Sequence, residues 1–167
     1  MEPGCFLLAM FKPVLGIATN PLTLGATIAL IVLVVLLFIS AMISGSEVAF
    51  FSLAPSDLQQ LKSKDSSNCA RVLKLLQMPE RLLATILITN NFVNVGIVIL
   101  SAYVVNSTFD FSDSPTLGFV IQAVVITFIL LLFGEIIPKV YASRFSSRFA
   151  LIMAFSLTVL DRFFRAV

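Results

Sequence analysis

Three stretches of the sequence are long and apolar enough to cross a lipid bilayer as helices: residues 22–43, 82–105 and 117–133. An α-helix needs about 20 predominantly apolar residues to span the hydrocarbon core. Only 12% of the 167 residues are charged, whereas a soluble domain carries about 25% charged residues. The sequence therefore predicts an all-α integral membrane protein with three transmembrane helices.

The residues that flank these runs set the limits of the predicted membrane domain. Residues 1–21 contain three prolines and Lys12, so this segment is too interrupted to span and is expected to be an extracytoplasmic, interfacial leader. The transmembrane domain is then predicted to cover residues 22–140. Its three spans are expected at about residues 22–50, 82–105 and 117–139.

Two further segments are expected outside the hydrocarbon core. Residues 54–81 mix leucines with basic side chains and contain a Ser-Ser-Asn break, so they predict a cytoplasmic helical hairpin. Within residues 141–167 the apolar run is only 149–160, which is too short to cross the bilayer. Because basic residues flank this run, it predicts an amphipathic juxtamembrane belt helix on the membrane surface, with a fourth short span as the alternative.

Basic residues near the ends of the spans predict the orientation. Five lie between positions 62 and 81, after the first span, and five lie between positions 139 and 165, after the third. On the opposite side of the membrane the sequence offers only Lys12. We therefore expect a multi-pass protein of the inner (plasma) membrane, with its amino terminus outside and its carboxyl terminus in the cytoplasm.

The residues that are missing narrow the possible functions. The chain has no histidine, and its two cysteines, Cys5 and Cys69, are far apart, which excludes histidine-ligated zinc and histidine-based acid–base catalysis. No Gly-x-Ser-x-Gly or His-Glu-x-x-His pattern is present, and no basic cluster suggests a nucleic acid partner. The sequence does not predict an enzyme.

The third run ends in the stretch Phe133–Lys139, which carries an acid, a glycine and a proline. An ionisable residue such as Glu135 is costly at the foot of a membrane-length apolar segment, so it usually has a function or a partner. In a helix, Pro138 cannot donate a hydrogen bond to the carbonyl of Gly134. Carboxylates and freed carbonyls are oxygen ligands that hard cations take. The alternative is a kinked helix end whose acid faces water or pairs with Lys139.

The other two runs also carry polar groups. Ser44–Glu47 lies inside a longer apolar stretch, where its small residues either allow close helix packing or offer ligands, and where the unpaired carboxylate of Glu47 would be unfavourable. The second run contains Asn90, Asn91 and Asn94, of which the first and last share one helical face. Asparagines within hydrocarbon often hold helices together, but three within five residues exceed that need, so we expect at least one ligand among them.

The predicted orientation brings these groups to a similar depth. At about 1.5 Å per residue, Asn90 and Asn94 lie roughly 12 to 18 Å above the inner end of the second span. Ser44–Glu47 and Gly134–Glu135 are delivered to the same cytoplasmic half by the first and third spans. Hydroxyl, amide, carboxylate and carbonyl oxygens from three helices together predict a cation site within the membrane.

Three motifs resemble the transmembrane domain of the CorC/cyclin-M family: Ser44–Glu47, Leu83–Asn94 and Phe133–Lys139. They occur in the family's order, and the resemblance covers nearly the whole chain. It implies a homodimeric magnesium transporter, with sodium-coupled Mg²⁺ efflux, and cytoplasmic CBS modules after the membrane part. Because no CBS pair is present before Val167, the chain is expected to be a domain of a longer protein.

The resemblance also implies the residues of the magnesium site. The expected ligands are Ser44, Asn90, Asn94, Gly134 and Glu135. Pro138 would form the distorted turn in the third helix, with Glu47 and Asn91 as supporting residues. The alternative function is a structural or assembly subunit of the membrane, in which these polar residues only fasten the helices.

Overall fold

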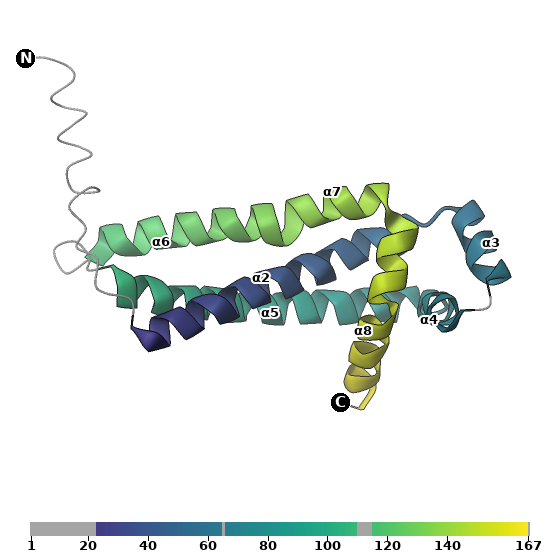
Figure 1. Ribbon diagram of the computed structural model, residues 1–167, viewed down its shortest axis with the longest axis horizontal. Helices are drawn as coiled ribbons and strands as arrows, with labels where there is room; N and C mark the ends of the chain where they lie inside the picture. Colours follow the sequence, from purple (N-terminus) through teal and green to yellow (C-terminus); the bar gives the residue numbers. More distant parts are fainter. Residues whose placement is uncertain (1–22, 65, 110–114, 167) are drawn as a thin grey trace, which may run out of the picture.

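The computed structural model describes residues 23–64, 66–109 and 115–166, so the predicted leader at residues 1–21 lies outside the described residues. Every regular element in these ranges is a helix, which confirms the all-α fold (Figure 1). The elements are α2 (Leu24–Phe51), α3 (Pro55–Ser63), α4 (Ser67–Leu76), α5 (Pro79–Thr108), α6 (Pro115–Ile129), the π-helix η1 (Leu130–Ile136), α7 (Ile137–Arg144) and α8 (Ser146–Ala166).

Three of the helices are long and apolar enough to cross a membrane: Leu24–Phe51, Pro79–Thr108 and Gly118–Arg144. The third is continuous through α6, η1 and α7, and the three run side by side in Figure 1. Large apolar side chains are exposed along all three, as lipid-facing surfaces require. The predicted three-span membrane architecture is confirmed.

The ends of α2 follow from local sequence signals. The Oγ1 atom of Thr23 accepts a hydrogen bond from the backbone N–H of Ala26 at 3.2 Å, so Thr23 caps the amino terminus of the helix. The helix does not break at the small polar residues Ser44–Glu47 but continues to Phe51. The serines, glycine and carboxylate are therefore displayed on a regular helix, at fixed angular positions.

The predicted hairpin forms from α3 and α4, beyond one end of the three spans (Figure 1). Pro55 occupies the first turn of α3, and a carboxylate oxygen of Asp57 accepts the backbone N–H of Ala54 at 3.1 Å. Ser66 is the amino-terminal cap residue of α4. The hairpin folds back so that α4 packs against α8.

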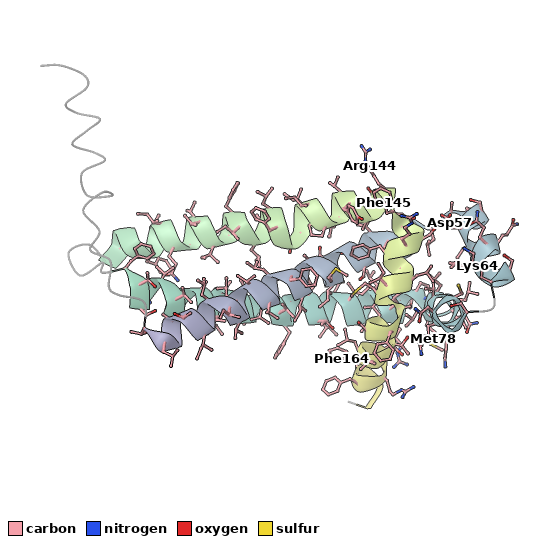
Figure 2. All side chains as sticks on the ribbon, in the orientation of Figure 1. Asp57, Lys64, Met78, Arg144, Phe145 and Phe164 are labelled. Carbon is pink, nitrogen blue, oxygen red and sulfur yellow. The ribbon has the colours of Figure 1, made fainter. Side chains whose placement is uncertain are left out.

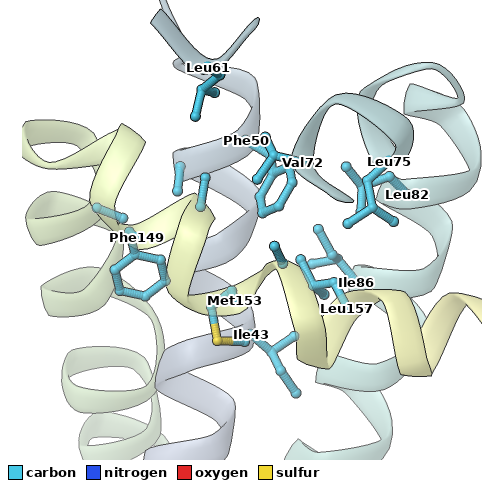
Figure 3. Close-up of a cluster of buried hydrophobic side chains, with 14 of the residues drawn as sticks. Ile43, Phe50, Leu61, Val72, Leu75, Leu82, Ile86, Phe149, Met153 and Leu157 are labelled. Atoms are coloured by element: carbon cyan, nitrogen blue, oxygen red, sulfur yellow. The ribbon is translucent and has the colours of Figure 1, made fainter. Parts of the chain in front are cut away.

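The apolar core gathers at this same end of the bundle (Figure 3). It joins side chains from the hairpin, the two spans α2 and α5, and α8. Its larger members are Ile43, Phe50, Leu61, Val72, Leu75, Leu82, Ile86, Phe149, Met153 and Leu157. The core holds α8 across the ends of the spans.

Helix α8 runs across the spans rather than along them (Figure 1). One face packs on the core through Phe149, Met153 and Leu157, while Phe155 and Val159 on another face are more than half exposed. A helix with a core-facing side and a separate exposed apolar stripe is suited to lie at a membrane surface. It is one helix of 21 residues and therefore extends well beyond the apolar run on which the belt helix was predicted.

Candidate cation site within the membrane

The centre of the site is the hydroxyl group of Ser40, which is completely buried on α2. Its Oγ atom donates a hydrogen bond to Oδ1 of Asn94 at 2.8 Å and lies 3.2 Å from Oδ1 of Asn90. The two asparagines are four residues apart on α5, so both amides face α2. The hydroxyl group of Ser40 is therefore shared between two amide oxygens, and three oxygen atoms from α2 and α5 lie close together.

Glu135 joins the site from the π-helix η1. Nδ2 of Asn94 donates a hydrogen bond to Oε1 of Glu135 at 3.3 Å, and the glutamate side chain is half-buried. Asn94 thus connects the hydroxyl of α2 to the carboxylate of the third span. Within the ranges that the structure describes, no three His, Cys, Asp or Glu residues gather as a metal cluster. The candidate site is built from one carboxylate and several neutral oxygens.

Gly134 lets η1 approach α2 closely. The residue is buried, and a Cβ atom added to it would lie 3.3 Å from Oγ of Ser40, tighter than an ordinary contact. The absence of a side chain therefore brings the backbone of the third span to the hydroxyl at the centre of the site.

The π-helix changes which backbone carbonyls lose their donors. The N–H of Ile137 donates to the carbonyl of Leu132, five residues back, rather than to that of Phe133. Pro138 has no N–H for the carbonyl of Gly134. Two successive carbonyls, those of Phe133 and Gly134, therefore lose their α-helical donors. The sequence predicted this effect for Gly134 through the proline, but it did not predict the π register.

Ser44 lies one turn beyond Ser40 on the same face of α2. Only 1% of the residue is exposed, and its Oγ atom has no hydrogen-bond partner among the residues that the structure describes. The nearby Ser46 is also buried, but its hydroxyl donates to the carbonyl of Met42 at 2.7 Å. Leaving a hydroxyl buried and unpaired costs about 1–3 kcal/mol. Ser44 is therefore a polar group in need of a partner.

The ion pair beside the site differs from the pair that the sequence offered as an alternative. Lys139 forms an ion pair with Glu47, with 3.0 Å between Nζ and Oε2, instead of pairing with Glu135 one turn earlier on its own helix. The alternative in which Glu135 pairs with Lys139 is wrong, because α2 packs against α7 and brings Glu47 within reach. Glu47 has a cationic partner and leaves Glu135 to the asparagines.

The structure brings together four of the five predicted ligands: Asn90, Asn94 and Gly134 lie beside Ser40, and Glu135 is hydrogen-bonded to Asn94. The fifth, Ser44, is one turn away and makes no hydrogen bond to them. Of the predicted supporting residues, Pro138 is the second residue of α7, and Asn91 is exposed on the surface of α5.

Ser40 is the site residue that sequence reasoning missed. Two signals pointed to it: it is the only polar residue between positions 28 and 43, and it precedes Ser44 by four residues.

The contributing groups lie at one depth. Ser40 is 11 residues before the end of α2, Asn90 is 11 residues after the start of α5, and Gly134 is 10 residues before the end of α7. At about 1.5 Å per residue, each is roughly 15 to 17 Å from the end of the bundle where α8 lies. That distance is about half the thickness of the hydrocarbon core.

This combination of a three-span bundle and buried polar groups at mid-depth agrees with a comparison against known families. The model of the cyclin M transmembrane N-terminal domain matches residues 31–167. The chain belongs to the cyclin M family. The resemblance inferred from its three motifs is confirmed.

Three curated relatives of this cyclin M domain are bacterial proteins. A UPF0053 protein of Haemophilus influenzae is 32% identical over 134 residues, covering 80% of the chain and 31% of the relative. The UPF0053 inner membrane protein YfjD of Escherichia coli is 33% identical over 123 residues, covering 74% and 28%. A polyamine export protein of Haemophilus influenzae is 30% identical over 142 residues, covering 78% and 33%. The chain spans about a third of the length of these relatives.

These similarities identify the chain as a membrane domain of the cyclin M type. The polyamine export protein bears a transport function in its name. The three apolar spans of the cyclin M domain described here require a lipid bilayer as their surroundings.

Proposed function

We propose that the chain is the membrane domain of a magnesium transporter and that it binds a dehydrated Mg²⁺ ion between α2, α5 and η1. The observation that supports this proposal is the convergence of the Ser40 hydroxyl with the amide oxygens of Asn90 and Asn94, beside the carboxylate of Glu135. The Ser40 hydroxyl lies within hydrogen-bond distance of both amide oxygens at the point where the three oxygens converge. A cation at that point would satisfy them together.

The donor set fits a hard cation. Magnesium takes oxygen ligands at about 2.0–2.1 Å in near-octahedral geometry. Hydroxyl, amide, carboxylate and carbonyl groups supply such oxygens, and the chain has no histidine that would favour a softer metal. The unpaired hydroxyl of Ser44 and the carbonyls of Phe133 and Gly134 are further candidate ligands.

We further infer sodium-coupled efflux of Mg²⁺. A single carboxylate among neutral oxygens suits a monovalent hard cation as well as a divalent one. If Na⁺ and Mg²⁺ occupy the same site in turn, one ion must leave before the other binds, as exchange through a single site requires. Competition by Na⁺ for bound Mg²⁺ tests this step, and additive binding of the two ions would contradict it.

The proposed setting follows from the relatives and the charge pattern. We propose an inner-membrane protein with its amino terminus outside and its carboxyl terminus in the cytoplasm, because basic residues gather in the hairpin and after the third span. A relative is named an inner membrane protein. The relatives are about three times as long, which leaves room for cytoplasmic CBS modules.

A homodimer is also proposed, and Asn91 supports it because its exposed amide requires a partner at membrane depth.

One observation favours a second candidate function. In the present arrangement the polar groups satisfy one another, so Ser40, Asn94 and Glu135 already fasten three helices together. In a structural or assembly subunit, these hydrogen bonds between helices would be the whole role of the three residues. The two functions differ in whether the purified chain binds an ion.

Titration calorimetry of the purified chain with Mg²⁺ tests the proposal. We expect saturable binding by the wild type and a loss of at least about tenfold in affinity in Asn94→Ala, equivalent to about 1.4 kcal/mol. Asn106→Ala is the matched control, because Asn106 is an exposed asparagine far from the site on the same helix. Equal Mg²⁺ binding by Asn94→Ala and wild type would overturn the assigned site.

A parallel titration with spermidine separates two kinds of cargo. The absence of saturable heat with either cation would favour the structural subunit. Saturable binding of spermidine without binding of Mg²⁺ would replace the proposal with polyamine transport, the function in the name of one relative.

A further inference from the structure

A pocket of about 120 Å³ lies where α4, the start of α5 and α8 meet. It is at the end of the bundle, on the far side of the apolar core from the cation site, and the mechanism proposed above does not use it. Four basic side chains line it, those of Arg71, Lys74, Arg81 and Arg162, with Asp161 as the only acidic lining residue. We call it the basic pocket.

Two of the arginines are held in place by neighbouring side chains. The guanidinium group of Arg71 donates a hydrogen bond to Oδ1 of Asn68 at 2.7 Å and lies 5.3 Å from the centre of the Phe155 ring. Arg81 donates through Nε to a carboxylate oxygen of Asp161 at 2.7 Å, and it also donates to the backbone carbonyl of that residue at 3.3 Å. Each guanidinium carries five N–H donors, so both retain donors for a ligand.

Cations outnumber anions among the described residues that line the basic pocket. Of the acidic and basic residues that line it, four are cations and one is an anion. Lys74 and Arg162 are exposed and form no ion pair with any residue that the structure describes. Guanidinium forks together with an ammonium group suit the several oxygens of a phosphate group.

The position of the pocket identifies the source of the phosphate. Leu75 and Leu82 contribute apolar walls beside the charges, and Leu82 is in the first turn of a span. Met78, which also lines the pocket, is labelled in Figure 2 at the junction of α4 and α5. The pocket therefore lies where a bilayer's headgroups meet its hydrocarbon core. Anionic lipids are recognised by basic pockets at that level, on the side that the charge pattern predicts to be cytoplasmic.

We propose that the basic pocket binds the phosphate group of an anionic phospholipid, with the acyl chains against the neighbouring ends of α5 and α8. Arg71 and Arg81 provide preformed donors, and Lys74 and Arg162 supply the remaining charge. The helices α4, α5 and α8 meet at the pocket. The apolar core already joins these three helices, and a bound headgroup would join them at a second place. The proposal does not depend on the identity of the transported ion.

Thermal unfolding of the chain in nanodiscs tests the proposal. The wild type is compared in phosphatidylcholine alone and in phosphatidylcholine with a minority of phosphatidylglycerol. We expect phosphatidylglycerol to raise Tm, and the double variant Lys74→Gln/Arg162→Gln to lose most of that rise. Native mass spectrometry should show phosphatidylglycerol retained by the wild type and released from the variant.

The matched control is Lys64→Gln/Arg144→Gln, which removes the same charge from exposed positions outside the pocket (Figure 2). It should keep the Tm rise. An equal loss in both double variants would show only a general attraction of the basic surface to lipid and would overturn the pocket. No Tm rise in the wild type would also overturn it. Inorganic phosphate that reproduces the rise in phosphatidylcholine alone would assign the pocket to soluble phosphates instead of lipid.

Discussion

Ser40 and Ser44 show how one residue type has two roles on the same face of a helix. The hydroxyl of Ser40 is satisfied by two amide oxygens, whereas that of Ser44 is buried with no partner in the described part of the chain. A buried unpaired hydroxyl is unfavourable unless a partner arrives. We interpret Ser44 as a ligand that the bound cation completes.

Replacing Ser44 by alanine tests this interpretation. Without the cation, Ser44→Ala should unfold at the same Tm as the wild type or higher, because it removes an unpaired polar group whose burial costs about 1–3 kcal/mol. With Mg²⁺, the ligand-dependent rise in Tm should be smaller than in the wild type. Melting curves measured with and without Mg²⁺ give both quantities.

Ser46→Ala is the matched control for this prediction, because Ser46 is buried on the same helix but its hydroxyl is paired with a backbone carbonyl. It should leave the Mg²⁺-dependent rise unchanged. A full rise in Ser44→Ala would mean that the hydroxyl is not a ligand.

At the scale of elements, the π-helix η1 is the unusual feature of the third span. A π-turn inserts one extra residue into an α-helix and occurs frequently at functional sites. Here it shifts the hydrogen bond of Ile137 back to Leu132, next to the position where Pro138 removes a donor. The two effects leave adjacent carbonyls without α-helical donors at the depth of the asparagines.

Pro138→Ala is expected to separate stability from ion binding. Alanine restores an N–H at a position where proline costs a helix interior about 3 kcal/mol, so the variant should melt no lower than the wild type. Mg²⁺-dependent stabilisation should fall, because the restored N–H competes for the carbonyl of Gly134. Paired melting curves with and without Mg²⁺ measure both effects.

Pro79→Ala is the control, because Pro79 is in the first turn of α5, where a backbone N–H has no helical acceptor. It should change neither property. A Pro138→Ala variant with undiminished Mg²⁺-dependent stabilisation would exclude the freed carbonyl as a ligand.

The contact between α2 and α8 depends on a second small residue. A Cβ atom added to Gly45 would lie 2.6 Å from the ring of Phe149, which is itself buried. Gly45→Ala should therefore lower stability by about 1–3 kcal/mol through overpacking, partly offset by the better helix propensity of alanine. At Gly96 the same methyl group would meet its nearest neighbour at 3.7 Å, an ordinary contact. Gly96→Ala should be neutral or stabilising, and denaturant unfolding of the two variants distinguishes the positions.

At the scale of the whole molecule, the sequence predicted the elements whose signals are local. Membrane-length apolar runs indicated the three spans. Pro55 and Pro79 are in the first turns of α3 and α5, where proline is favoured. The predicted orientation of the spans places Asn90, Asn94 and Glu135 at one depth, and the structure places them there as well.

The features that were missed depend on packing between helices. The ion pair of Glu47 with Lys139 forms because α2 lies against α7, and no local pattern specifies that neighbour. The choice of Ser40 over Ser44 as the hydroxyl nearest the asparagines depends on the register between α2 and α5. The π register of η1 involves a shift of one residue, which hydrophobic periodicity does not resolve.

The exposed amide of Asn91 links the site to the assembly of the molecule. Asn91 and Asn94 border a shallow groove on α5 whose other lining residues are Val95, Val98 and Ile99. An unpaired amide at mid-depth is unfavourable in lipid, and a second copy of the chain across this groove would supply its partner. The same contact would cover the lipid-facing side of the cation site, so dimerisation and ion binding are expected to be coupled.

Asn91→Leu should therefore weaken the proposed dimer. Interhelical asparagine hydrogen bonds contribute about 0.6 to 2 kcal/mol, so the dissociation constant in detergent should rise by about 3-fold to 30-fold. At protein concentrations below the dissociation constant, the Mg²⁺ affinity of the variant should be lower than that of the wild type. At concentrations above the dissociation constant, the two affinities should be equal. Asn106→Leu removes an exposed amide near the far end of the same helix and should leave both quantities unchanged. Sedimentation equilibrium measures the dissociation constant, and an Asn91→Leu variant that dimerises like the wild type would place the interface on another face of the bundle.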